Sequence, residues 1–333
     1  MTVLAGWIKI AGPGLLTARW LSFLLASAAF IGLGRFWLRL RLPPEGLILI
    51  AIAFLSRHWT VMANMARMEA LFLCLILLCL QLLWQGRTLA AAGLALLTLT
   101  VHPNALYFMA GLPLLAWWAP RRSYSGPVNL GLAALGLLVT GGYGLYALAH
   151  WDYFTSDWRW QLASRSADAL GILLFRPDQA VFIVLVGALA YWAWRTQRCE
   201  IGFALTTAML FWATRVLGQG WAYGIFNVIA VTLVLGCALA WTRLWLWPRL
   251  TQSLQAYAPW ATASGLALAL GVAQIYTLPR FNPADYYWMG MPMHPAAVPH
   301  FTPADRVAAR AAIYRLRPPG THKAYLRPHV AGT

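Results

Sequence analysis

The sequence has few charged residues, and hardly any of them are acidic. Only 10% of its 333 residues are charged, against about 25% in an ordinary soluble domain, whereas 61% are hydrophobic and the mean hydropathy is +0.62. This composition excludes an ordinary soluble domain and predicts an integral membrane protein. Nine acidic residues against 25 lysines and arginines give a formal net charge of +16. We attribute this excess to cytoplasmic loops and lipid headgroups rather than to nucleic acid, because no basic run is long enough to form a soluble patch.

The sequence also lacks the usual signatures of cofactor and metal chemistry. Its four cysteines have neither disulfide nor zinc-site spacing: Cys74, Cys79 and Cys237 lie in apolar runs and Cys199 lies in a short loop. There is no P-loop, dinucleotide glycine fingerprint, nucleophile elbow or metal-binding histidine pair. We therefore expect no cofactor, with a divalent metal left open.

Apolar runs predict an all-α integral membrane protein of about ten transmembrane helices. The candidate stretches are 18–36, 46–57, 68–84, 88–101, 103–119, 128–149, 179–195, 201–217, 222–242 and 258–278. Those at 46–57, 88–101 and 103–119 are shorter than the roughly 20 residues of a full span, as helices around a cavity often are. No internal repeat appears, so an inverted-repeat transporter gains no support.

We divide the chain into a polytopic transmembrane domain, 1–278, and an extracytoplasmic C-terminal tail, 279–333. The domain contains an external loop at about 150–179. Within this loop, Asp157–Arg165 is rich in tryptophan and predicts an amphipathic helix in the headgroup plane. A short helix is expected at 302–316 in the tail.

The distribution of arginine predicts the orientation in the membrane. The arginines of alternate short loops, taken as cytoplasmic, are Arg35, Arg39, Arg41, Arg87, Arg121, Arg122, Arg195, Arg198, Arg243 and Arg249. The acidic residues that the same alternation places outside are Glu69, Asp152, Asp157, Asp168, Asp178, Asp285 and Asp305, with Glu45 and Glu200 inside. Met1 then also lies outside, and we expect that the chain lacks a first transmembrane helix and the loop after it.

Glu69 is the leading candidate for a catalytic residue. It is the only carboxylate between Glu45 and Asp152, and it stands where an arginine-bearing turn enters a long apolar run. An ionisable residue at the membrane is a functional candidate by default, together with the nearby Arg67. The alternative is an interfacial pair that caps the helix, where a glutamate in the first turn is favoured by the helix dipole.

Other polar residues are expected at the same external ends of the membrane helices as Glu69. Arg57 and His58, at the outer end of the 46–57 helix, can form a cationic rim for a phosphate with Arg67, or can be residues that snorkel to the interface. His102 and Asn104 flank a proline between two apolar runs. They can hydrogen-bond a sugar, or can satisfy backbone groups freed by the proline.

The external loop adds Arg159 and Arg165 as candidate substrate-binding residues. Both lie in the stretch expected to form an amphipathic helix. A solvated surface that faces the lipid headgroups is the simpler interpretation of these two arginines.

Three stretches together resemble the GT-C polytopic glycosyltransferases. Ile10–Ser22 is similar to the segment that enters their second helix, Ala66–Leu71 resembles their Arg-x-Asp/Glu motif, and Leu99–Leu106 resembles a polar break further along. The protein mannosyltransferase and aminoarabinose transferase branches are the most similar. The likeness covers the first 120 residues, and the remaining helices match only in general pattern.

The resemblance implies inverting transfer of a sugar from a polyprenyl-phosphate donor to an acceptor, whose identity stays open, on the extracytoplasmic face. By match, Arg67 and Glu69 correspond to the family motif and help to shape the site. No residue here matches the first-loop carboxylate of the family. Two rival hypotheses stay open: a flippase or transporter of lipid-linked sugars, and a non-catalytic scaffold subunit. The preference for arginine over lysine, with abundant Ala, Gly and Leu, indicates a GC-rich bacterial genome, and we expect the protein in the cytoplasmic membrane of a bacterium.

Overall fold

The described part of the chain is entirely helical. The computed structural model describes residues 2–12, 15–64, 69–102, 105–120, 126–152, 155, 177–217, 224–250 and 252–277, and no strand occurs among them. By internal contacts the chain divides into two compact units, residues 1–272 and 273–333. The predicted tail, 279–333, lies outside the described residues, as do the helices predicted at 157–165 and 302–316, so these remain predictions.

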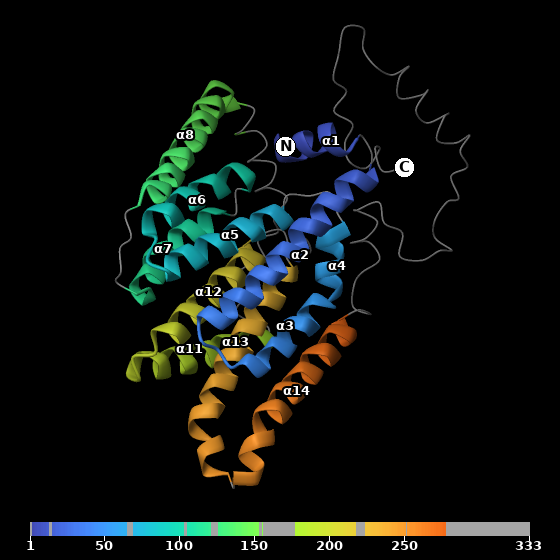
Figure 1. Ribbon diagram of the computed structural model, residues 1–333, viewed down its shortest axis with the longest axis vertical. Helices are drawn as coiled ribbons and strands as arrows, with labels where there is room; N and C mark the ends of the chain where they lie inside the picture. Colours follow the sequence, from blue (N-terminus) through green and yellow to red (C-terminus); the bar gives the residue numbers. More distant parts are fainter. Residues whose placement is uncertain are drawn as a thin grey trace, which may run out of the picture. The chain divides into compact units, whose positions relative to one another are not determined.

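Each of the ten predicted stretches contains a helix. In chain order the elements are α1 (Thr2–Ala11), α2 (Leu15–Arg39), η1 (Pro44–Gly46), α3 (Leu47–Phe54), α4 (Arg57–Asn64), α5 (Glu69–Trp84), α6 (Thr88–Val101), α7 (Ala105–Trp118), α8 (Pro127–Ala149), α11 (Pro177–Arg195), α12 (Cys199–Leu217), α13 (Gly224–Trp245), η2 (Trp247–Arg249) and α14 (Gln252–Thr277). The labels are those of Figure 1.

Among the described residues, three helices have the length and composition to cross a membrane: Thr17–Arg39, Pro127–Ala149 and Gly224–Arg249. Shorter apolar helices account for most of the other predicted stretches, and α6 and α7 have 14 residues each. The protein is therefore all-helical with the apolar helices of a membrane protein. The count of ten spans is not confirmed and stays a prediction.

The predicted helix at 46–57 is wrong in one respect that matters for the site. It ends at Phe54, and a second helix, α4, begins at Arg57. Ser56 causes the restart, because its hydroxyl oxygen accepts a hydrogen bond from the backbone N–H of Trp59 at 3.2 Å, as a helix N-cap does. Arg57 and His58 consequently open a new helix instead of closing the old one.

The helices pack in two groups. In one, α2, α5, α6 and α8 form a row in which each helix packs on the next (Figure 1). In the other, α12 packs on α7, α11 and α13. The groups meet where α7 contacts α5 and α6, and α3 and α4 connect them because both pack on α2 and on α13.

Trp37 of α2 joins three elements in the core. Its side chain is fully buried, and its indole N–H donates to the carbonyl of Pro43 at 2.8 Å. The ring lies directly on the backbone of Gly46 and of Gly236: a Cβ at these glycines would come within 3.0 Å of Trp37 Cη2 and 2.6 Å of Trp37 Cζ3, respectively. Only glycine leaves room for the ring at both places.

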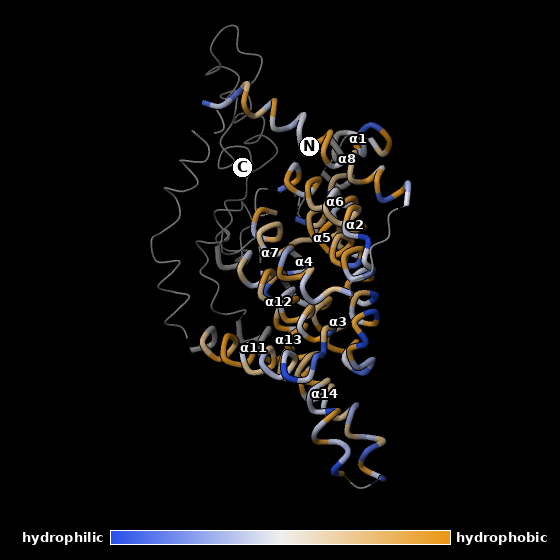
Figure 2. The backbone as a smooth tube through the Cα atoms, turned by 90° about the vertical axis from the view of Figure 1, so that its left-hand side faces the viewer, coloured by the Kyte–Doolittle hydropathy of each residue, from blue (hydrophilic) through white to orange (hydrophobic). Residues whose placement is uncertain are grey.

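The arginine-bearing ends of several helices gather at one end of the bundle. Arg39 ends α2, Arg41 follows it and Arg87 precedes α6, and all three line one cavity with the start of α12. Arg243 near the end of α13 lies 3.8 Å from the carboxylate of Glu45 in η1. In Figure 2 the helices are largely hydrophobic and hydrophilic turns lie along the right-hand edge. The alternation of loops and the orientation in a membrane stay predictions.

Candidate functional site

Glu69 begins α5 and is almost completely buried. The helix starts at this glutamate and continues through an apolar run to Trp84, so the carboxylate stands in the first turn, where the helix dipole favours it. Its residue is only 4% exposed. Burial of a carboxylate is costly unless its surroundings compensate for it, so this position demands specific neighbours.

Phe72 connects the start of α5 with the end of α6. It lies one turn after Glu69, on the same face of the helix, and is fully buried. Its ring centroid lies 5.5 Å from that of His102, 6.0 Å from that of Phe108 and 5.7 Å from that of Phe226. The imidazole of His102 therefore packs beside the first turn of α5.

His102 ends α6 in an extended conformation, with φ −152° and ψ 130°. The cause is local, because the residue before a proline disfavours helical backbone and Pro103 follows. The backbone N–H of His102 donates to the carbonyl of Thr98 at 2.9 Å, and its own carbonyl accepts from Ala105 at 3.0 Å. The break thus keeps its backbone bonded while it turns the half-buried imidazole toward Phe72.

His58 lies against the first residue of α13. A Cβ on Gly224 would overlap the His58 ring, 2.5 Å from Cε1 and 2.8 Å from Cγ. Phe226, two residues into α13, is the same residue that packs on Phe72. The contacts therefore run from His58 through the start of α13 to Phe72, and from Phe72 to His102.

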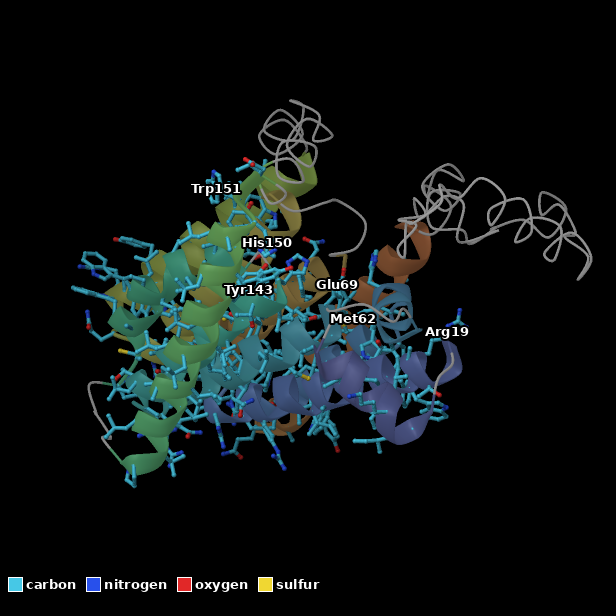
Figure 3. All side chains as sticks on the ribbon, turned by 90° about the horizontal axis from the view of Figure 1, so that it is seen from above. Arg19, Met62, Glu69, Tyr143, His150 and Trp151 are labelled. Carbon is cyan, nitrogen blue, oxygen red and sulfur yellow. The ribbon has the colours of Figure 1, made fainter. Side chains whose placement is uncertain are left out.

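His58, His102 and the buried Glu69 thus lie at the ends of helices that meet around the aromatic residues Phe72 and Phe226. Contacts of α4 with α5 and α13, and of α5 with α6, hold these ends together. Such an arrangement can transfer protons and can bind hydroxyl groups in a mostly apolar environment. In Figure 3, Glu69 and Met62 lie between Arg19 of α2 on one side and the C-terminal part of α8, with Tyr143, His150 and Trp151, on the other.

Several predicted site residues lie outside the described residues: Arg67, Asn104, Arg159 and Arg165. Arg57 is the first residue of α4 and therefore lies next to His58 in the chain. Over the ranges that the structure describes, no group of three or more His, Cys, Asp or Glu residues is placed to hold a metal ion.

Gly224 and the aromatic residues around Phe72 were not among the predicted site residues. Phe72 had a signal in the sequence, since it follows Glu69 by three residues and shares its helix face. Gly224 had none, because its close approach to His58 joins two segments that are far apart in the chain.

The fold and the site define an all-helical membrane protein with a buried carboxylate at a helix start. Comparisons with family models, with curated proteins and with solved structures give no match. The resemblance to the GT-C glycosyltransferases accordingly rests on the three sequence stretches alone.

Proposed function

We propose that the protein is a GT-C-type membrane glycosyltransferase that moves a sugar from a polyprenyl-phosphate donor to an acceptor on the extracytoplasmic face of a bacterial cytoplasmic membrane. One observation carries the proposal. A carboxylate that is 4% exposed opens an apolar helix of 16 residues. His102 packs on Phe72, one turn further along the same helix, and His58 packs on Gly224 at the start of α13.

The proposed step is a single inverting displacement. The acceptor hydroxyl oxygen forms a bond to the anomeric carbon of the sugar, while the bond from that carbon to the phosphate oxygen breaks. The hydroxyl proton passes to the Glu69 carboxylate, and polyprenyl phosphate departs with the bonding electrons. A base raises the nucleophilicity of the hydroxyl group, and cations stabilise the departing phosphate.

Two arginines suit the stabilisation of the departing phosphate. Arg57 begins α4, and Arg67 stands two residues before Glu69. A guanidinium group binds two phosphate oxygens at once. His58 and His102, and in the same segment Asn104, are assigned to hydrogen bonds with the sugar or the phosphate, and Arg159 and Arg165 to the headgroup side of the donor.

The test is sugar transfer in membranes that contain the protein, with labelled polyprenyl-phosphate mannose and aminoarabinose as donors. The decisive comparison is Glu69→Gln with Glu45→Gln. Glu45 is the matched control because it is also buried, at 8% exposure, but lies beside Arg243. We expect Glu69→Gln to lower transfer by about 100-fold or more, the usual contribution of a general base, and Glu45→Gln to leave it within a few-fold.

Donor binding separates an enzyme from its rivals. Retained binding of the labelled donor in Glu69→Gln, together with lost transfer, supports a role in the chemical step. If the protein binds the lipid-linked sugar but transfers none to any membrane component, the glycosyltransferase assignment fails. The transporter or scaffold hypothesis then takes its place.

A further inference from the structure

A cavity of about 680 Å³ opens at the far end of α5 from Glu69. Its lining residues come from the ends of α2, α5 and α7 and the starts of α6 and α12: Arg39, Arg41, Trp84, Gln85, Arg87, Trp118, Pro120, Cys199 and Glu200. Glu69 and Trp84 are the first and last residues of α5, which has 16 residues and is therefore about 22 Å long. The cavity is thus separate from the candidate catalytic site.

The lining is strongly cationic. The lining contains three arginines and one carboxylate, that of Glu200. This carboxylate forms an ion pair at 3.4 Å with Arg198, which is not a lining residue. The net charge of the lining side chains is therefore +2. A cluster of guanidinium groups in a concave site at the membrane surface selects for phosphate oxygens.

Arg39 is held in place by its neighbours. Its Nη1 donates to the Gln81 side-chain oxygen at 3.0 Å, and its backbone carbonyl accepts from the Trp84 indole at 3.1 Å. Gln81 is buried and also donates to the Gly32 carbonyl at 3.0 Å. In the orientation that satisfies its amide, the Gln85 oxygen accepts from Arg39 Nη2 at 3.2 Å. A guanidinium fixed in this way loses little further side-chain entropy when it binds an anion.

The start of α6 adds positive potential. Arg87 is the residue immediately before this helix and supplies no side-chain cap to it. The first backbone N–H groups of a helix have no acceptor within the helix and carry the positive end of its dipole. Two tryptophans in the lining, Trp84 and Trp118, suit the boundary between headgroups and acyl chains.

We propose that this cavity is a binding site for a phosphate group, either the phosphodiester of an anionic lipid headgroup or the phosphate of a small soluble anion. Basic pockets between helix ends are typical sites for anionic lipids. The three arginines bind the phosphate oxygens, and the tryptophans contact the glycerol and the upper acyl chain in the lipid case.

Cys199 provides a native reporter of occupancy. It is exposed and lines the cavity, whereas Cys79 and Cys237 are buried and Cys74 is partly buried. The rate of its reaction with an uncharged maleimide is measured with the protein in phosphatidylcholine vesicles. The measurement is repeated with 30% phosphatidylglycerol added, and separately with 10 mM inorganic phosphate, at roughly physiological ionic strength.

We expect occupancy to slow the labelling of Cys199 by about fivefold or more. If phosphatidylglycerol slows the labelling and inorganic phosphate does not, the site binds a lipid headgroup. If inorganic phosphate slows the labelling, the site binds a small anion. Arg87→Gln should weaken the binding of the protecting ligand by about tenfold, because it removes one charge-assisted contact. Arg195→Gln removes an equal charge from the exposed end of α11, outside the cavity, and should leave protection unchanged.

Two results would overturn the proposal. One is an unchanged labelling rate with both ligands. The other is equal loss of protection in Arg87→Gln and Arg195→Gln, which indicates that the membrane surface potential alone slows the reaction.

Discussion

Substitution of Gly136 by alanine tests the close crossing of α6 and α8. Gly136 of α8 lies against Gly93 of α6, and a Cβ at Gly136 would overlap the Gly93 carbonyl oxygen and approach its Cα to 2.7 Å. A Cβ at Gly93 would likewise come within 2.6 Å of the Ala133 Cα. These neighbours are backbone atoms, so no side-chain rotation relieves the clash and the two helices must separate.

The expected cost follows from three contributions. Overpacking that shifts backbone costs about 1–3 kcal/mol. Separation also lengthens the hydrogen bond from Thr140 Oγ1 to the Leu96 carbonyl, now 2.8 Å, and such bonds between membrane helices are worth about 0.6 kcal/mol. Against this, alanine is favoured over glycine within a helix by about 1 kcal/mol. The net destabilisation of Gly136→Ala is therefore about 0.6–2.6 kcal/mol.

Gly144→Ala is the matched control on the same helix. No atom lies within 4 Å of a Cβ placed there, so only the helix propensity remains, and the variant should be neutral or more stable by up to about 1 kcal/mol. The helix-propensity gain is common to both variants, so they should differ by about 1.6–3.6 kcal/mol.

The assay is unfolding of the purified protein by sodium dodecyl sulfate in detergent micelles. Nineteen tryptophans give a strong fluorescence signal, and circular dichroism monitors helix content. Equal midpoints for Gly136→Ala and Gly144→Ala would refute the close crossing of α6 and α8.

Two further substitutions test the core and the site. Gly236→Ala should destabilise the protein by about 1–3 kcal/mol in the same assay, because its Cβ meets the buried Trp37 ring, whereas Gly265→Ala, with no atom within 4 Å, should not. Gly224→Ala should displace the His58 ring and lower sugar transfer by tenfold or more with a smaller effect on donor binding; transfer at the native rate contradicts the assignment of His58 to the site.

Much of the local structure followed from sequence. A helix lies in each of the ten predicted apolar stretches, because a backbone in an apolar environment must satisfy its hydrogen bonds within the helix. Pro103 located the break at His102, since a residue before proline leaves the helical region. Glu69 at the start of α5 was predicted from its isolation among apolar residues and the helix dipole.

The errors were also local. The restart of the helix at Arg57 was missed although Ser56 is a good N-cap, because the apolar run continued across it. The helix α1 was not predicted, although Gly12, with φ +90°, ends it as a C-terminal glycine does.

The convergence of distant segments came only from tertiary packing. Nothing in the chain near His58 indicates Gly224, nothing near Trp37 indicates Gly236, and nothing near Gly93 indicates Gly136. Likewise, the arginines at the ends of separate helices line one cavity only because the turns after α2 and α5 lie beside the start of α12 in the folded protein. Periodicity and length set where helices begin and end, because those depend on neighbouring residues. Which helix faces meet depends on the fit of side chains against glycine backbone across the whole bundle, and that fit is a property of the packed molecule.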